Sequence, residues 1–373
     1  MSRLEELIQK HCPNGVEYKK LGDVCLMERG TSATKGTMQE GDIPVISGGR
    51  QPAFYCSQSN REGETITVAG SGAGAGYVQY WNKPIFVCDA FSIKGNDSLN
   101  TKFIYYFLSS IQEKIYATKK GGGVPHVHIS SIDKFVIPVP PLPVQEEIVR
   151  ILDNFTELQA ELQAELQKRL QQYNYYRDKL LSFSDLSNWG GQEVSVEWKK
   201  LGEVADLGTG SHNTQDGLSE GKYPFYTRGS EILYLNDYDY DETAIITAGD
   251  GAGVGKVFHF VQGKYALHQR AYRIVPNEKI VLARYIYYYI GATFYNYIMK
   301  SSVSSSVVSI RKPMMVNYPI PVPPLEEQER IVSILDRFDT LTTDITAGLP
   351  AEIEARRKQY EYYRDRLLTF QRK

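Results

Sequence analysis

The sequence predicts an α+β fold in which two similar domains are separated by two long helices, and in which these helices pair as an antiparallel coiled coil with pseudo-twofold internal symmetry. Three observations lead to this prediction. Residues 140–183 recur as residues 323–370, both copies have the apolar spacing of a long helix, and the segments before the two copies also correspond to each other. An internal repeat of this size determines the architecture before any motif is considered.

The repeated segment has the same motifs at its start and at its end. It begins with PPLPVQEEIVRILDNF in one copy and PPLEEQERIVSILDRF in the other, and it ends with YYRDKLLSF and YYRDRLLTF. Phe155 and Phe338 are 183 positions apart, whereas Tyr176 and Tyr363 are 187 apart, so the second copy has four additional residues. The expected parts are a domain at 1–143, a helix at 144–186, a domain at 187–325 and a helix at 326–373.

Each copy has the features of one long helix. Pro143 lies where a proline is tolerated in a first turn, and apolar residues recur along one face from Ile148 to Leu180. About 40 helical residues would extend about 60 Å, which is too long for burial in one small domain. We expect the two helices to pair, with an interruption at Gly348 and Pro350, although each could instead pack on its neighbouring domain.

The two domains have matching frame sequences with different residues between them. VEYKKLGDV corresponds to VEWKKLGEV, ITVAGSGAGAGYV to IITAGDGAGVGKV, and FIYYFL to YIYYYI. We expect strands at 64–70 and 242–249, and helices at 101–120 and 283–300 whose aromatic pairs belong to the core instead of forming a stacking platform. The PVPPL segments are interpreted as extended connectors into the long helices.

The composition points to a soluble protein of the cytoplasm and gives no global sign of nucleic-acid binding. Lys and Arg total 42 and Asp and Glu total 44, so any basic surface must be local. No apolar run reaches 18 residues, no secretory leader is apparent, and the four cysteines lack CxxC spacing. A disulfide framework and a zinc site are therefore not expected.

Glycine-rich loops occupy the same place in both domains, at 70–76 and 249–255. Neither fits GxGxxG, and neither ends in GK[ST], so neither is a standard phosphate-binding loop. A tight turn between strands explains both loops, and a turn that also lets the backbone approach DNA is the alternative.

A second shared position carries cations beside Gly and Ser residues. The first copy contains GGGVPHVHIS, and its counterpart, SSSVVSIRK, lacks histidine. A His-x-His metal site is disfavoured, because no acidic or cysteine partner lies at ligand spacing. Contact with phosphates or base edges and a solvated surface loop both remain open.

The sequence contains no recognisable catalytic constellation. Nucleophile elbow, HExxH, Walker and paired-carboxylate motifs are missing, as is the Asn-Pro-Pro-aromatic tetrapeptide of amino-methyltransferases. We expect the chain to perform no chemistry alone.

Two unlike domains alternating with two near-identical helices resemble the specificity subunit of type I restriction-modification systems. The paired helix motifs and the domain frames KKLGDV and KKLGEV carry this resemblance over essentially the whole chain. The ELQA-ELQA-ELQK run at 157–168 is similar to the central tetrapeptide repeats of one subfamily, although its sequence differs from the commonest version.

The resemblance implies a non-catalytic subunit that binds double-stranded DNA, with each target-recognition domain reading one half of a bipartite site. It also implies two modification subunits carrying S-adenosylmethionine and two restriction subunits using ATP and Mg²⁺, with no cofactor, metal or membrane bound by this chain itself. The helices would set the spacing of the half-sites and dock the modification subunits. A coiled-coil scaffold that binds only proteins, and an enzyme acting unaided on DNA or sugar, are the competing functions.

Divergent polar residues near the shared loops are the candidates for DNA contact, because Arg, Gln and Asn can make bidentate contacts with base edges, whereas Lys more often binds phosphate. The set expected to include the DNA-facing residues is Arg50, Lys119, Lys120, His126 and His128 in the first domain, and Asn213, Arg228, Lys256, Gln269, Arg270 and Arg311 in the second.

Overall fold

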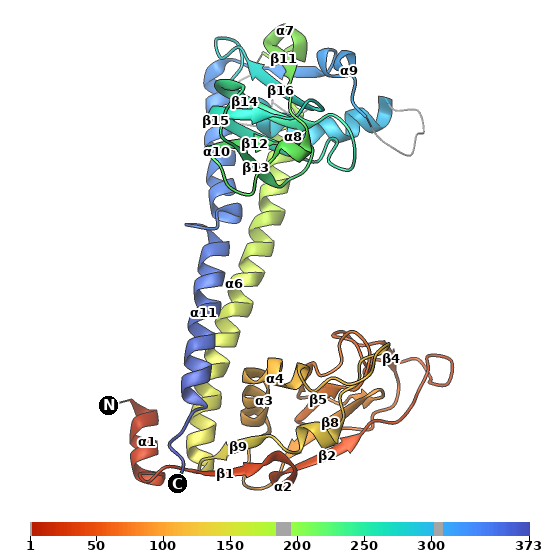
Figure 1. Ribbon diagram of the computed structural model, residues 1–373, viewed down its shortest axis with the longest axis vertical. Helices are drawn as coiled ribbons and strands as arrows, with labels where there is room; N and C mark the ends of the chain where they lie inside the picture. Colours follow the sequence, from red (N-terminus) through yellow and green to blue (C-terminus); the bar gives the residue numbers. More distant parts are fainter. Residues whose placement is uncertain (1, 184–194, 302–308) are drawn as a thin grey trace. The chain divides into compact units, whose positions relative to one another are not determined.

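The computed structural model describes residues 2–183, 195–301 and 309–373, which divide into two compact units (Figure 1). Unit 1 comprises Met1–Gln163 and Glu352–Lys373, and unit 2 comprises Ala164–Ala351. Each unit therefore combines one globular domain with parts of both long helical segments. The boundaries between the units fall inside the long helical segments, at 163/164 and 351/352. The boundaries expected from the sequence lie instead at the ends of the globular domains, and they stay a prediction.

The domain of unit 1 consists of short helices and strands followed by the first long helix. Its elements are α1 (Arg3–His11), β1 (Glu17–Lys20), α2 (Leu21–Val24), β2 (Cys25–Arg29), β3 (Ile43–Ile46), β4 (Phe54–Cys56), β5 (Thr65–Ala69), β6 (Val78–Trp81), β7 (Phe86–Val87), β8 (Ala90–Gly95), α3 (Thr101–Ser110), α4 (Gln112–Tyr116), α5 (Ile129–Ile132), β9 (Val136–Val139) and α6 (Leu142–Ser182).

The second half of the chain repeats this order. Its elements are β10 (Glu197–Lys200), α7 (Leu201–Val204), β11 (Ala205–Thr209), the 3₁₀ helix η2 (Thr214–Asp216), β12 (Tyr223–Tyr226), β13 (Ile232–Leu235), β14 (Tyr240–Ala248), β15 (Phe258–Leu267), β16 (Ala271–Pro276), α8 (Ala283–Ser301), α9 (Lys312–Val316), β17 (Pro319–Val322), α10 (Leu325–Thr343) and α11 (Leu349–Leu367).

The two domains have the same strand topology with one local difference. Unit 2 has a six-stranded sheet in the order β11-β16-β14-β15-β12-β13, whereas unit 1 has the sheets β2-β8-β5-β6 and β4-β3-β7. The continuous β15 corresponds to β6 and β7, which are separated by a segment that contains Pro84. Proline has no N–H to donate to a strand ladder, so Pro84 disfavours continuous pairing there.

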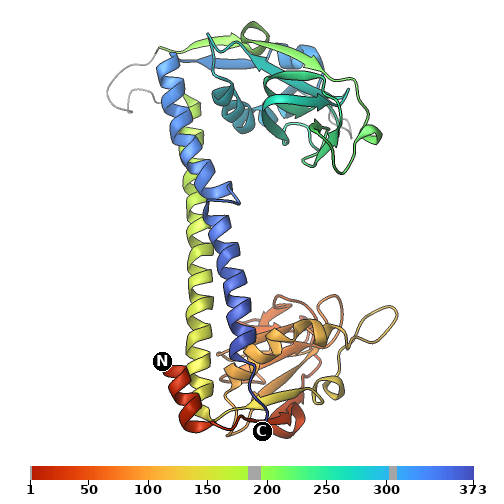
Figure 2. The same ribbon diagram turned by 60° about the vertical axis from the view of Figure 1, so that its left-hand side comes forward.

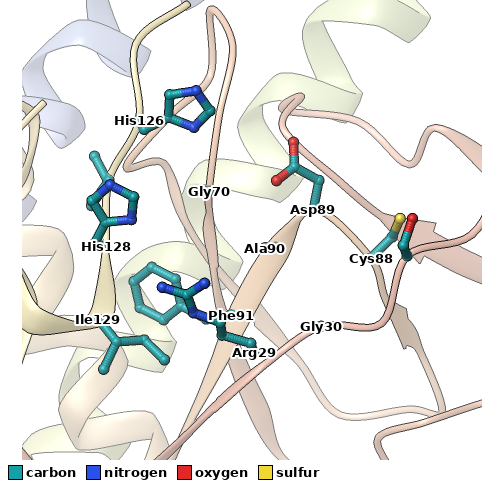
Figure 3. A pocket seen from close by; sticks show the side chains of 12 residues that line it. Arg29, Gly30, Gly70, Cys88, Asp89, Ala90, Phe91, His126, His128 and Ile129 are labelled. Carbon is teal, nitrogen blue, oxygen red and sulfur yellow. The ribbon is translucent and has the colours of Figure 1, made fainter. Parts of the chain in front are cut away.

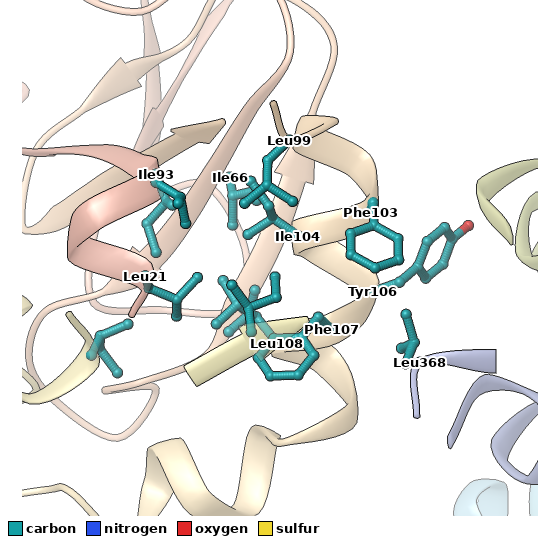
Figure 4. Close-up of a cluster of buried hydrophobic side chains, with 14 of the residues drawn as sticks. Leu21, Ile66, Ile93, Leu99, Phe103, Ile104, Tyr106, Phe107, Leu108 and Leu368 are labelled. Carbon is teal, nitrogen blue, oxygen red and sulfur yellow. The ribbon is translucent and has the colours of Figure 1, made fainter. Parts of the chain in front are cut away.

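The core of unit 1 forms where α3 packs on the sheet (Figure 4). Ile66 and Ile93 lie opposite each other on β5 and β8, and they contact the same apolar cluster as Phe103 and Ile104 of α3. Leu368, which follows α11, joins this cluster, so the end of the second long segment contributes to the core of the first domain.

The aromatic helices confirm the prediction that their tyrosines belong to the core. Tyr106 of α3 is 1% exposed, and Tyr288 of α8 is 3% exposed. The helix expected at 283–300 corresponds to α8. The helix expected at 101–120 is divided at Ile111 into α3 and α4 and ends at Tyr116, so its predicted continuity and length were wrong.

The long segments pair antiparallel, as expected. In unit 1, Phe155 of α6 stacks on Tyr363 with ring centroids 5.6 Å apart, and in unit 2, Tyr176 of α6 stacks on Phe338 of α10 at 5.9 Å. The first turns of α6 and α10 also enter the cores of their own domains, so both proposed packing arrangements occur. None of the described helices is both long and apolar enough to cross a lipid bilayer.

The ends of the helices differ in detail from the sequence prediction. The interruption expected at Gly348 and Pro350 is confirmed, because α10 ends at Thr343 and α11 begins at Leu349. The first helix was expected at 144–186, whereas α6 ends at Ser182 and Phe183 has a positive φ of 51°. Residues 184–186 lie outside the described ranges.

A buried glutamine fastens each domain to the long helix that follows it. Gln145 of α6 is fully buried, and its side-chain amide donates to the carbonyls of Pro140 (2.6 Å) and Ser98 (2.8 Å). Its Oε1 accepts the N–H of Asn100, the N-cap residue of α3, at 2.8 Å. The amide therefore joins the starts of two helices and the loop before α3.

Gln328 repeats this arrangement in unit 2. Its amide donates to Pro323 O at 2.8 Å and to Ile280 O at 3.2 Å, and its Oε1 accepts from Leu282 N at 2.8 Å. The two glutamines are matched positions of the sequence repeat, so the internal symmetry extends to individual hydrogen bonds.

A second contact fixes each helix about two turns further along. Asp153 accepts from Tyr106 Oη at 2.5 Å and pairs with Lys102 Nζ at 2.8 Å. In unit 2, Asp336 accepts from Tyr288 Oη at 2.5 Å and from Arg284 Nε at 2.7 Å. Two contacts along one helix restrict rotation of the domain about the helix axis, as a single contact would not.

The two ends of the chain pair with each other in unit 1 (Figure 2). Val16 N donates to Gln371 O at 2.9 Å, Lys373 N donates to Val16 O at 3.1 Å, and Tyr18 Oη donates to Phe370 O at 2.9 Å. The segment after α11 therefore lies beside the segment that leads into β1.

Replacing Gln145 or Gln328 with alanine should lower the free energy of unfolding by about 1–3 kcal/mol, because buried backbone groups lose their hydrogen-bond partners. Urea denaturation measures this change. The matched control is Gln171→Ala on the exposed surface of α6, which should change stability by no more than about 0.5 kcal/mol. Equal losses in Gln145→Ala and Gln171→Ala would contradict the fastening role.

Candidate nucleic-acid interface

The two loops that the sequence places at equivalent positions lie side by side in each unit. Gly70 O accepts a hydrogen bond from Val127 N at 2.9 Å, and Gly249 O accepts one from Ile310 N at 2.8 Å. Each pair connects the glycine loop to the segment that carried the predicted cations. The structure therefore unites the two sequence signals at one edge of each domain.

The glycine loops are tight turns between antiparallel strands, as the sequence predicted. A Cβ at Gly74 would lie 2.4 Å from Gly48 O, and a Cβ at Gly253 would lie 2.3 Å from Arg228 O. Both distances are too short for any side chain. Glycine at these positions lets the loop pack directly on the backbone that follows β3 or β12.

In unit 2, two arginines converge on one carboxylate. Arg228 Nη1 lies 2.8 Å from Asp250 Oδ1, and Arg270 Nη1 lies 3.0 Å from Asp250 Oδ2. Burial alone would raise the pKa of Asp250, but the hydrogen bonds and charges of both arginines outweigh this effect and hold the pKa below its usual value. Asp250 is therefore ionised at neutral pH and orients two guanidinium groups.

Two amide side chains lie beside the arginine pair, in a cleft of unit 2. Gln269 Nε2 donates to Asn213 Oδ1 at 2.5 Å, and both residues line a cleft of about 570 Å³ together with Arg228, His268 and Arg270. Burial lowers the pKa of His268, as does the nearby charge of Arg228. Four predicted residues of the second domain are thus brought together.

The remaining predicted residues of the second domain lie outside the lining of this cleft. Lys256 is on the glycine loop, where its Nζ lies 5.3 Å from the ring centroid of Tyr295. Arg311 is exposed and occupies the N-cap position of α9.

In unit 1, the corresponding edge contains a cavity of about 350 Å³ (Figure 3). Its polar lining includes Arg29, Asp89, His126 and His128, and Phe91 forms part of its apolar wall. The imidazole rings of His126 and His128 are nearly parallel, with an interplanar angle of 3° and centroids 6.1 Å apart.

The other predicted residues of the first domain do not line the cavity. Arg50 lies over the ring of Tyr77 at 5.0 Å, and Lys119 lies over the ring of Tyr116 at 4.2 Å. The backbone of Lys120 exchanges hydrogen bonds with that of His126, at 2.9 and 2.8 Å.

Arg29 and Asp89 line the cavity but were not among the residues predicted from the sequence. A signal for Asp89 was available, because it immediately precedes a β-strand at the position matched by Arg270 in the second copy. The prediction favours side chains that suit a polyanion, and a carboxylate does not. Within residues 2–183, 195–301 and 309–373, no three His, Cys, Asp or Glu side chains are grouped to hold a metal ion.

The sequence matches the family model described as type I restriction modification DNA specificity domain twice, at residues 13–172 and 193–355. The chain belongs to this specificity family. The two matches coincide with the two halves of the repeat, and they confirm the resemblance drawn from the helix motifs. Sequence-specific DNA recognition without catalysis is the role of the family, which decides against the scaffold and against an enzyme acting alone.

Relatives within the specificity family cover most of the chain. The specificity subunit of the type I restriction enzyme EcoR124I/EcoR124II from Escherichia coli is 37% identical over 298 residues, which cover 72% of this chain and 70% of the relative. A protein of Haemophilus influenzae described as a type I restriction enzyme specificity subunit is 31% identical over 405 residues, with 98% of both proteins covered.

Solved structures of the family have the same fold. The crystal structure of a type I restriction-modification S subunit from M. genitalium has a TM-score of 0.69 and 20% identity, and the similarity covers 95% of this chain and 97% of that one. At this identity the likeness concerns the fold alone.

Replacing Gly253 with alanine should displace the loop that carries Asp250, because the new Cβ would collide with Arg228 O. We expect a loss of about 1–3 kcal/mol in stability, the usual cost of overpacking, and faster amide exchange in the loop. Hydrogen exchange detected by mass spectrometry measures this effect. The control Gly229→Ala, whose Cβ would have no neighbour closer than 3.9 Å, should leave the loop unchanged; equal exchange in both variants would refute the packing argument.

Proposed function

We propose that the chain is the DNA-reading subunit of a type I restriction-modification complex, and that each domain reads one half of a bipartite target. The observation that carries this proposal is the gathering of Asn213, Arg228, Gln269 and Arg270 at one cleft of unit 2. The matched backbone of unit 1 presents different polar side chains, as two readers of unlike sequences require.

The side chains of the cleft have the chemistry that base edges need. A guanidinium can bind guanine O6 and N7 together, and a carboxamide can bind adenine N6 and N7. Asp250 and Asn213 hold these groups by hydrogen bonds in the free protein, which reduces the conformational freedom lost on binding. Lys120, Lys256 and Arg311 are proposed to contact phosphates, which position a protein on the duplex without reading its sequence.

The proposed protein partners are two modification subunits and, through them, two restriction subunits. Each unit supports one docking site, because exposed apolar residues recur at matched positions. Tyr175 and Tyr362 are 60% and 59% exposed, and Leu142 and Leu325 are 40% and 38% exposed. The proposal assigns S-adenosylmethionine, ATP and Mg²⁺ to these partners and no cofactor to this chain.

Alanine at Arg270 or Arg228 should weaken recognition of the second half-site only. Loss of a bidentate base contact costs about 1–3 kcal/mol, which corresponds to about 5-fold to 150-fold in affinity. Fluorescence anisotropy on duplexes carrying each half-site change, with the modification subunit present, measures this loss at a fixed salt concentration. The control Lys279→Ala removes an exposed cation of the same domain. If neither arginine variant changes binding by about threefold, the assignment fails.

We also propose that the length of the continuous helix α6 sets the number of unspecified base pairs between the half-sites. Its residues 142–163 belong to unit 1 and residues 164–182 to unit 2, so a change within it alters the covalent path between the domains. One ELQA unit contributes four residues, or about 6 Å of helix, which corresponds to at most about two base pairs of B-DNA.

Deleting Glu161 to Ala164 should therefore retain both half-sites and shorten the preferred spacer by one or about two base pairs, while one added ELQA unit should lengthen it. A four-residue change can be absorbed by local unwinding of a helix pair. Methylation-aware sequencing of cells carrying each variant gives the spacer. Replacing Glu161, Leu162 and Gln163 with alanines preserves the length and serves as the control; an unchanged spacer in active deletion and insertion variants would exclude this function of α6.

A further inference from the structure

The residue before β8 in unit 1 and the equivalent residue before β16 in unit 2 carry opposite charges. Asp89 precedes β8, and Arg270 precedes β16. The surrounding backbone is the same, because Gly70 N donates to Asp89 O at 3.0 Å and Gly249 N donates to Arg270 O at 2.8 Å. The fold therefore places a carboxylate and a guanidinium at one equivalent point.

The partner of this side chain has also been exchanged. Asp250 accepts from Arg270 in unit 2, and the matched loop position in unit 1 is Ser71, whose hydroxyl donates to Asp89 Oδ2. In the described part of the chain, no Lys, Arg or His forms an ion pair with Asp89. Its charge is thus held in place by a neutral group and is not cancelled by a direct ion pair.

Asp89 is exposed and lines the 350 Å³ cavity with Arg29, His126 and His128 (Figure 3). Gly30 and Gly70 form part of the same lining. A Cβ at Gly30 would lie 2.1 Å from Cys88 O, and one at Gly70 would lie 3.1 Å from Asp89 Oδ1. A side chain at Gly30 would thus collide with the backbone, and a side chain at Gly70 would crowd the carboxylate of Asp89.

An exposed carboxylate is electrostatically unfavourable beside the phosphates of DNA unless it meets a hydrogen-bond donor. An ionised carboxylate accepts hydrogen bonds and donates none. In the major groove the amino groups of cytosine N4 and adenine N6 are donors, whereas guanine O6 and N7 and thymine O4 are acceptors, with which a carboxylate cannot pair. On adenine the acceptor N7 lies beside N6 and repels a carboxylate, so Asp89 would favour cytosine over the other bases.

We propose that Asp89 reads the N4 amino group of a cytosine in the first half-site, while Arg270 at the equivalent position reads a guanine in the second. The inference rests on the proposed DNA-reading function and adds a specificity-determining residue to it. The two half-sites would then differ in base identity at a position that both domains address with the same backbone. Arg29 also lines the cavity, and its charge offsets part of the repulsion between Asp89 and the DNA backbone.

The test uses the full chain assembled with its modification subunit and a DNA library randomised in both half-sites. Wild-type protein should select cytosine at one position of the first half-site. Asp89→Asn retains the shape but adds a donor, and we expect it to reduce the cytosine preference by at least about fivefold, the lower end for a base contact. The second half-site and the melting temperature should not change.

The double variant Ser71→Asp with Asp89→Arg transplants the pair of unit 2 onto unit 1, and guanine should replace cytosine at that position. Asp97→Asn, a change of an exposed carboxylate elsewhere in the domain, is the matched control and should retain the wild-type preference. Since the double variant can fail to fold, its melting temperature is measured, and Asp89→Asn decides the question alone if folding is lost.

The outcomes separate this inference from the proposed function. If the wild-type complex selects no sequence, the DNA-reading function itself fails. If the wild-type complex selects a sequence but Asp89→Asn keeps the same base preference at every position, the assignment of Asp89 is overturned. A lower melting temperature with unchanged preferences would overturn it too, because Asp89 would then act only by holding Ser71.

Discussion

The buried amide at the start of each long helix is the contact on which the arrangement of each unit depends. Gln145 and Gln328 satisfy backbone groups of the proline connector and of the segment before the aromatic helix, in fully buried surroundings. A buried polar group without partners is costly, so these hydrogen bonds permit few alternative orientations. Each domain is thereby fixed to its helix in one geometry.

This constraint separates stability from specificity. The apolar cores, the glutamine contacts and the Asp153 and Asp336 contacts are equivalent in the two units, whereas the side chains at the recognition edge differ. Exposed substitutions away from packed or strained positions usually change stability little. The edge can therefore vary in charge and shape while the backbone that presents it stays the same.

Much of the fold followed from the sequence because its signals were periodic and duplicated. The repeat, the long helices and the strand turns each arise from local patterns that recur in both copies, and the interruption near Gly348 arises from a glycine and a proline present only in the second copy. The division of one predicted helix at Ile111 did not follow, because α3 and α4 are both amphipathic and only tertiary packing fixes the break. The separate sheets of unit 1 depend on Pro84, whose effect is visible only once β15 shows the uninterrupted alternative.

The sequence predicted those residues of the candidate site that lie near the loops common to both domains. Arg228 and Arg270 were selected individually, but their convergence on Asp250 joins segments that are distant in sequence. Asp89 lines the cavity of unit 1 but was not predicted, because cationic and amide side chains are the usual partners of DNA. A protein that binds base edges needs hydrogen-bond acceptors as well as donors. The charge of a side chain is therefore informative only when it is compared with the charge at the equivalent position of the other domain.

The four additional residues of the second copy illustrate how the helix pair keeps its contacts. They fall in the segment between α10 and α11, where Asp344 Oδ1 accepts from Thr346 N at 2.7 Å, and a Cβ at Gly348 would lie 2.4 Å from Thr340 O. Four residues inserted into a continuous helix would rotate the following face by about 40°. Formation of a turn avoids this rotation, so Tyr360 and Tyr363 remain against Phe155. Because α6 is uninterrupted, the turn is the place where the second segment can accommodate a difference in length from α6.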